Sequence, residues 1–208
     1  MSVALSRFFS NPVIPVVVID DARQAVPLAE TLLAGGINAI EITLRTEQAL
    51  AAMAAIAKHV PDMLLTAGTA LNAGHLQQVK DAGASLVVSP GISVELLDAA
   101  KVLGLTLLPG IASASELMLG LNHGLSHFKL FPASAINGIG LAKALAGPFP
   151  EARFCCTGGI TEADLPLYLN EPNIPSVGVS WLASRQAIAA GRWDEIRDAA
   201  LRLKLPTR

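Results

Sequence analysis

Cysteine, aromatic residues, charge of one sign and long apolar runs are all scarce in this sequence, and each scarcity excludes a class of protein. The only two cysteines, Cys155 and Cys156, are adjacent, so the chain has no disulfide framework. A net charge of -2 and an aromatic content of 4% predict neither a basic surface nor a stacking platform for nucleic acid. No apolar run approaches the ~20 residues of a membrane-spanning helix, and the short run 13–19 contains Pro15 and lacks the cleavage site of a signal peptide. We therefore expect a cytoplasmic protein with no nucleic-acid or membrane partner.

Apolar residues, in contrast, are abundant. They make up 52% of the 208 residues, whereas charged residues make up 15%. This composition is sufficient for a sizeable core and unlike that of a disordered chain. No linker rich in Ser, Gly or Pro and no block of charge divides the sequence, so residues 1–208 are expected to form one domain.

Short segments rich in Val, Ile and Leu alternate with longer Ala-rich segments of helical periodicity. The short segments are apolar almost throughout, which indicates strands buried on both faces, and the intervening helices indicate parallel pairing. The predicted strands are Val13–Ile19, Ala39–Arg45, Leu64–Thr69, Leu86–Pro90, Thr106–Ile111, His127–Pro132, Arg153–Gly158 and Ser176–Leu182. The predicted helices are Ala22–Ala34, Glu47–Lys58, Ala73–Ala82, Val94–Leu103, Ser115–Leu121, Gly140–Ala146, Glu162–Leu169 and Arg185–Leu203.

Residues that begin and end helices flank these segments. Helix-ending glycines are Gly35, Gly36, Gly83 and Gly104. The expected N-caps are Asp20, Thr46, Asn72, Ser93, Ser113 and Thr161. Eight strand–helix units in succession predict an α/β fold, a single (β/α)8 TIM barrel. The alternative, an open doubly wound sheet, would carry a glycine-rich loop after its first strand, and residues 19–23 contain no glycine.

Lys129 is the polar residue that fits its surroundings least. It is the one lysine that falls inside a predicted strand, whereas the other five fall on helix patterns. An ammonium in a dry barrel mouth is costly unless it is paired or deprotonated, and a neutral amine can attack a ketone to form a Schiff base. The alternative is a lysine at the barrel rim that reaches solvent or makes a structural ion pair.

Glu41 lies in a second apolar strand, where alternation places Glu41, Thr43 and Arg45 on one face. The strands of Glu41 and Lys129 are the second and the sixth, which are opposite in an eight-stranded barrel. The two side chains could therefore meet across the mouth and exchange protons. An ion pair without chemistry remains the alternative.

Other polar residues and glycines lie toward the ends of the predicted strands. Arg45 suits bidentate recognition of a carboxylate or phosphate, or is simply solvated. Thr69 could contact a substrate or cap a helix. Glycines at 158, 159 and 178, in or directly after the last two predicted strands, suit a phosphate site built from backbone N–H groups, although turns also use glycine freely. His127 is expected to be a core or rim residue, and the cysteines to be buried apolar side chains, so no metal site is predicted.

Taken together, the motifs resemble the 2-keto-3-deoxy-6-phosphogluconate (KDPG) / 4-hydroxy-2-oxoglutarate (KHG) aldolase family. The resemblance extends from Pro12 to Trp181. Its motifs are Glu41-Ile42-Thr43-Leu44-Arg45, Ala67-Gly68-Thr69, Ser89-Pro90-Gly91, Phe128-Lys129-Leu130-Phe131-Pro132-Ala133 and Thr157-Gly158-Gly159-Ile160. It implies a homotrimer of barrels that needs no metal or other cofactor.

The resemblance also implies a reaction and a role for each site residue. The reaction is reversible cleavage of 2-dehydro-3-deoxy-6-phosphogluconate to the 2-oxo acid pyruvate and the phosphorylated aldehyde glyceraldehyde 3-phosphate. Lys129 would form the Schiff base, Glu41 would be the general acid/base, and Arg45 would bind the pyruvyl carboxylate. The supporting residues would be Thr69 and Pro90 in the pyruvyl pocket, Thr157 at the hydroxyl-bearing portion, and Gly158, Gly159, Val179 and Ser180 at the phosphate.

Three positions depart from the family pattern. Cys156 stands where proline is frequent, Ser134 where glutamate is frequent, and Gly178-Val179-Ser180 replaces Gly-Gly-Ser or Gly-Thr-Thr. These departures affect which aldehyde the protein is expected to prefer more than they affect the expected Schiff-base chemistry. Two alternative functions remain: cleavage or decarboxylation of an unphosphorylated oxo acid such as 4-hydroxy-2-oxoglutarate, and non-catalytic binding of a phosphosugar.

Overall fold

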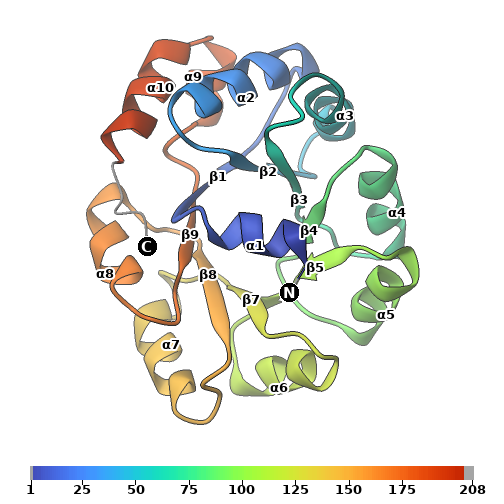
Figure 1. Cartoon of the computed structure of the whole chain (residues 1–208), viewed down its shortest axis with the longest axis vertical. Coiled ribbons are helices and arrows are strands. Elements are labelled where there is room, and N and C mark those ends of the chain that lie inside the picture. The colour runs from blue at the N-terminus through green and yellow to red at the C-terminus, as the bar shows by residue number, and fades with distance from the viewer. Residues whose placement is uncertain (1, 204–208) are drawn as a thin grey trace.

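Short parallel strands close into a barrel that helices surround (Figure 1). The computed structural model describes residues 2–203. Hydrogen bonding joins the strands in the order β5-β4-β3-β2-β1-β9-β8-β7-β6, and every pair is parallel. The strands are β1 (Val13–Val17), β2 (Ala39–Thr43), β3 (Leu64–Gly68), β4 (Leu86–Val88), β5 (Thr106–Leu108), β6 (Gly110–Ile111), β7 (His127–Leu130), β8 (Arg153–Thr157) and β9 (Ser176–Val179).

The helices lie outside the strands, except for α1. They are α1 (Val3–Phe9), α2 (Ala25–Ala34), α3 (Ala49–His59), α4 (Ala73–Asp81), α5 (Val94–Leu103), α6 (Ala114–Asn122), α7 (Gly138–Ala146), α8 (Leu165–Leu169), α9 (Arg185–Ala189) and α10 (Trp193–Arg202), with the 3-10 turns η1 (Ala22–Gln24) and η2 (Glu162–Asp164). In the part of the chain that the structure describes, no helix is long and apolar enough to cross a membrane.

β5 and β6 are two halves of one predicted strand, interrupted at Pro109. β5 pairs with β4 and β6 pairs with β7, and the N–H of Lys129 donates to the carbonyl of Pro109 over 2.9 Å. Proline has no N–H to contribute to the ladder, which explains the break. The ring therefore has eight positions, as predicted, and the (β/α)8 barrel is confirmed over the open sheet.

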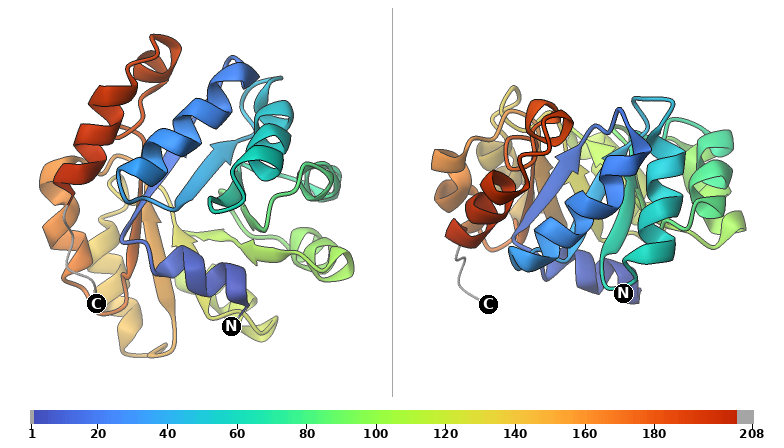
Figure 2. Two further views of the ribbon diagram at one scale, coloured as in Figure 1. Left: turned by 45° about the horizontal axis from the view of Figure 1, so that its top comes forward. Right: turned by 90° about the horizontal axis from the view of Figure 1, so that it is seen from above.

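Helix α1 was not predicted from the sequence. It lies across the end of the barrel where the strands begin, as the side view in Figure 2 shows. Phe8 is fully buried there, in a cluster with interior side chains such as Ile14, Leu64 and Leu108. This end of the barrel is thus packed with apolar groups, which leaves the opposite end, where the strands finish, for polar side chains.

Some predicted boundaries were wrong because the chain leaves the sheet early at the mouth. β1 ends at Val17 and β9 at Val179, and the residues that follow form loops. The single helix predicted from Arg185 onward is two helices, since Gly191 adopts a φ of 62° between α9 and α10.

The predicted helix starts were correct at Asn72, Ser93 and Ser113, whose side chains accept backbone N–H groups. Thr161 also begins η2, with a reciprocal capping box to Asp164. Thr46 does not cap: its hydroxyl donates to the carbonyl of Ile19 instead.

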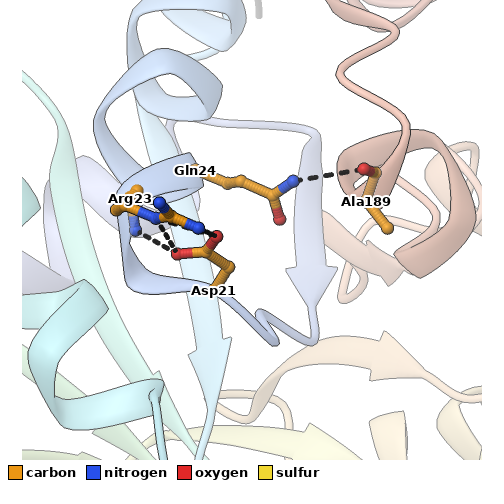
Figure 3. Close-up of polar contacts among 4 residues, drawn as sticks. All are labelled: Asp21, Arg23, Gln24 and Ala189. Atoms are coloured by element: carbon orange, nitrogen blue, oxygen red, sulfur yellow. Dashed lines mark hydrogen bonds and ion pairs between the residues drawn. The ribbon is translucent and has the colours of Figure 1, made fainter.

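The predicted cap at Asp20 was also wrong. Its neighbour Asp21 accepts the N–H of Arg23 at the start of η1 and also pairs with the Arg23 guanidinium (Figure 3). Asp20 instead pairs with Arg185 at the start of α9. Together with the bond from Gln24 to the carbonyl of Ala189 in Figure 3, this ion pair ties the loop after β1 to α9.

Candidate active site

Lys129 and Glu41 meet inside the barrel. The Lys129 Nζ donates to Glu41 Oε1 over 3.2 Å, and the residues are only 6% and 2% exposed. Burying either charge alone would be strongly unfavourable, whereas the pair offsets much of that cost. The side chains from the second and sixth strand positions therefore meet across the barrel in direct contact.

The register of the strands explains why these two side chains converge. Glu41 is in register with Val16 and Thr66, and Lys129 with Cys155, so both face the interior on opposite walls of the barrel. Within residues 2–203, the Lys129 ammonium is the only hydrogen-bond partner of the Glu41 side chain. An amine and a carboxylate in direct contact, away from bulk water, can pass a proton between them.

Phe131 also belongs to the site, although the sequence analysis gave it no role. Its ring centroid lies 5.3 Å from the Lys129 Nζ, within the range of a cation–π contact. Strand alternation could have identified it, because residues two apart face the same side. The ring reduces the space open to water beside the amine.

Cys155 lies on the interior wall next to Lys129, and its Sγ is 3.9 Å from the hydroxyl of Thr157. The pKa of the Cys155 thiol is raised to about 12, mainly by burial and also by the negative charge of Glu41, whereas Lys129 opposes the shift. Cys156 points to the helix layer, where burial likewise raises its pKa. Both are protonated, apolar side chains at neutral pH, in agreement with the prediction.

The residues predicted around the pyruvyl group lie at the ends of β2, β3 and β4. Thr69 follows β3 with a φ of 65°, an unfavourable conformation for a β-branched residue and one that often occurs at functional sites. Pro90 is half-buried, and the carbonyl of Pro90 packs on Gly110, where a side chain would overlap it. Arg45 is exposed, and its guanidinium has no partner among the described residues. It does not reach Lys129 or Glu41 in this structure.

The residues predicted around the phosphate form two adjacent loops, because β8 pairs with β9 and Thr157 is in register with Gly178. Thr157 is buried, and a methyl group on Gly178 would overlap its hydroxyl. Gly158 and Gly159 have φ values of 106° and 74°, which only glycine adopts readily.

The end of the second loop is open to solvent. Val179 is buried as the last residue of β9, and Ser180 after it is exposed. Ser134 lies against the first loop, because its N–H donates to the carbonyl of Gly158 over 2.9 Å and its Cβ faces Gly159. The glycine backbone, Ser134 and Ser180 therefore form this part of the mouth.

His127 lies at the other end of β7, where its ring packs against Phe9 at a tilt of 54°, with ring centroids 4.8 Å apart. Burial, with help from the positive charge of Arg153, lowers the pKa of His127. It is a rim histidine beneath α1, in agreement with the expectation. Within residues 2–203, no three His, Cys, Asp or Glu side chains gather in a group that could hold a metal ion.

A sequence model of one protein family, the KDPG and KHG aldolases, matches residues 5–199. The chain belongs to the KDPG and KHG aldolase family. It is 50% identical over 193 residues to a 2-dehydro-3-deoxy-phosphogluconate aldolase of Pseudoalteromonas atlantica, covering 93% of this chain and 90% of that protein. It is 46% identical over 197 residues to a KHG/KDPG aldolase of Escherichia coli, covering 95% of this chain and 92% of that protein.

Solved structures of family members share the fold. A KDPG aldolase of Legionella pneumophila, captured at low pH with pyruvate as a covalent carbinolamine, superposes with a TM-score of 0.93 and 43% identity. The match covers 97% of this chain and 98% of that one. A Zymomonas mobilis aldolase with 3-phosphoglycerate matches with a TM-score of 0.87 and 43% identity, covering 96% and 93%.

Proposed function

We propose that this protein is a class I aldolase that cleaves 2-dehydro-3-deoxy-6-phosphogluconate reversibly to pyruvate and glyceraldehyde 3-phosphate. The observation that carries the proposal is the buried Lys129–Glu41 pair, with a nitrogen–oxygen distance of 3.2 Å. A structural ion pair at the rim would explain charge balance but not why both groups face the open end of a barrel. Family membership and the Legionella pneumophila structure with its covalent pyruvate adduct support the same chemistry.

The reaction begins with proton transfer. Glu41 accepts a proton from the Lys129 ammonium, and the neutral amine attacks the C2 ketone of the substrate. Glu41 then returns its proton to the hydroxyl of the carbinolamine, which leaves as water and gives an iminium that draws electrons from the C3–C4 bond. Glu41 then takes the proton of the C4 hydroxyl, directly or through one water. The bond breaks, and the phosphorylated aldehyde leaves.

The second half releases pyruvate. The enamine left on Lys129 takes a proton at C3, supplied by Glu41, and hydrolysis of the resulting iminium frees pyruvate and the amine. In this scheme Arg45 binds the pyruvyl carboxylate, and Thr69 and Pro90 line the pocket beside it. The exposed guanidinium of Arg45, which has no partner within residues 2–203, supports this role because its donors are available for an incoming carboxylate.

Trapping with borohydride tests the proposed chemistry. Incubation with pyruvate and sodium borohydride is expected to reduce the imine and add a pyruvate-derived mass to Lys129, located by peptide mass mapping. The exposed Lys143 serves as an internal control, because it pairs with Glu171 at the surface and should stay unmodified. A folded protein with no adduct on Lys129 would refute the Schiff-base mechanism and favour a phosphosugar-binding barrel.

The phosphate contact separates the proposed substrate from unphosphorylated oxo acids. We propose that the backbone of Gly158, Gly159 and Val179 and the hydroxyl of Ser180 bind the phosphate. Replacing Ser180 by Ala removes one hydrogen bond to a charged group, so KM for the phosphorylated substrate should rise about tenfold. KM for 4-hydroxy-2-oxoglutarate, measured in the same steady-state assay, should not change. Equal effects on both substrates would favour the unphosphorylated alternative.

The homotrimeric state and the cytoplasmic location expected from the sequence are proposed here as well. The exposed apolar side chains of Val94, Val102 and Met118, on α5 and α6, are available for contacts between copies of the chain. The proposed partners are thus a small 2-oxo acid, a phosphorylated aldehyde and further copies of this chain.

A further inference from the structure

Glu41 has little to hold its carboxylate in place. Its single hydrogen bond among residues 2–203 goes to Lys129, the same group whose protons it is proposed to handle. During a reaction cycle that amine becomes neutral and then covalently bound, so the bond cannot position the carboxylate throughout. Some other contact has to do so.

Gly68 provides that contact. It is the last residue of β3, two positions beyond Thr66, which is the register partner of Glu41. The Glu41 side chain leans toward the mouth and crosses Gly68 at very short range. A methyl group built on Gly68 would overlap Glu41 Oε1 and lie 2.8 Å from Cγ and 2.9 Å from Cδ.

The backbone does not explain a glycine here. Gly68 is not among the residues with positive φ, and it lies in regular strand pairing in which its carbonyl accepts the N–H of Leu44. Alanine would have no difficulty with that conformation. The side-chain space, taken up by the Glu41 carboxylate, is what excludes a larger residue.

We propose that Gly68 is a positioning residue: because it has no side chain, the Glu41 carboxylate can pack against it and is held beside Lys129. This inference rests on the proposed acid/base role of Glu41. It assigns a specific task to the central glycine of Ala67-Gly68-Thr69, whose neighbour Thr69 lines the pyruvyl pocket in the proposed scheme.

Gly68→Ala tests the assignment through proton transfer to the pyruvyl carbon. Glu41 can exchange the methyl protons of pyruvate with D2O through the enamine, without any aldehyde, and NMR measures the rate. A carboxylate displaced by about 1 Å is expected to lower this rate and kcat by ~10- to 100-fold. Trapping of the Lys129 adduct with pyruvate and borohydride should still go to completion, because the amine is unchanged.

Gly35→Ala is the matched control. A methyl group there would lie 2.5 Å from the Cβ of Ala200, which is comparable overpacking, but between α2 and α10 outside the barrel. This variant should lose thermal stability and keep the wild-type exchange rate. A similar loss of exchange in both glycine variants would show a general effect of overpacking and overturn the proposal.

Removing the Glu41 side chain supplies a second, independent measurement. In a Glu41→Ala background the overlap with a methyl at position 68 no longer exists. Gly68→Ala should therefore lower Tm in the protein with Glu41 and have little effect on Tm in the Glu41→Ala background. This cycle remains informative even if Gly68→Ala alone folds poorly.

The outcomes separate the inference from the function on which it rests. If the wild-type protein neither exchanges pyruvate protons nor forms the Lys129 adduct, the proposed function fails. If the wild-type protein does both and Gly68→Ala exchanges within about twofold of it, the positioning role fails and the function stands. An equal loss of Tm with and without the Glu41 side chain would also overturn the positioning role.

Discussion

Lys129→Ala is expected to abolish aldol cleavage, with kcat lowered by a factor on the order of 10⁴ or more. The reason is that no other amine reaches this part of the barrel: the remaining lysines among the described residues lie on or beside the outer helices. Without the iminium, the electrons of the breaking C3–C4 bond have no acceptor. Steady-state cleavage of the phosphorylated substrate, coupled to detection of pyruvate, measures the loss.

The alanine variant leaves Glu41 buried without its partner, which can cost about 3–5 kcal/mol of stability. Lys129→Arg is therefore the necessary companion. A guanidinium keeps the positive charge beside Glu41 but stays protonated and forms no imine. Far-UV circular dichroism should show a folded barrel with no turnover. Turnover at the wild-type rate in either folded variant would exclude Lys129 as the Schiff-base residue.

Glu41→Gln is expected to lower kcat by ~10²–10⁴, the usual contribution of a positioned acid/base. Glutamine has nearly the same shape, so it still fits over Gly68, but it cannot accept and return a proton. The Lys129 adduct with pyruvate should form more slowly, and exchange of the pyruvate methyl protons should fall with kcat.

Glu171→Gln is a matched control for this substitution. Glu171 pairs with Lys143 over 2.9 Å at the surface, so the same loss of charge occurs far from the barrel interior. That variant should leave kcat unchanged. If Glu41→Gln also keeps the wild-type kcat, Glu41 is only the ion-pair partner of Lys129.

Glu41 and Gly68, the two positions expected to affect exchange of the pyruvate methyl protons, differ in how far the sequence could identify them. A glutamate inside an apolar strand is conspicuous by itself, because burial of a carboxylate requires compensation. A glycine at a strand end is not, because turns, bulges and loop entries all use glycine. Only the packing of Glu41 across Gly68 shows why a side chain is excluded there.

The fold prediction was strongest where local pattern and tertiary structure make the same demand. The strands of the barrel are largely buried on both faces, so they are apolar almost throughout, and that pattern is visible residue by residue. The predictions at Asp20 and Thr46 failed for the opposite reason. Both residues look like helix caps in isolation, but Asp20 pairs with Arg185 and Thr46 with the carbonyl of Ile19, both distant in sequence.

The sequence by itself determined the alternation of strands and helices from residue 13 onward, the closure expected from eight such units, and the candidates Lys129 and Glu41. These follow from periodicity and from the cost of burying a charge, which act on each segment separately. Tertiary structure alone decided the break at Pro109, the docking of α1 under the barrel and the contact between Lys129 and Glu41. Each of these depends on residues far apart in the chain reaching contact distance, and no local pattern encodes that distance.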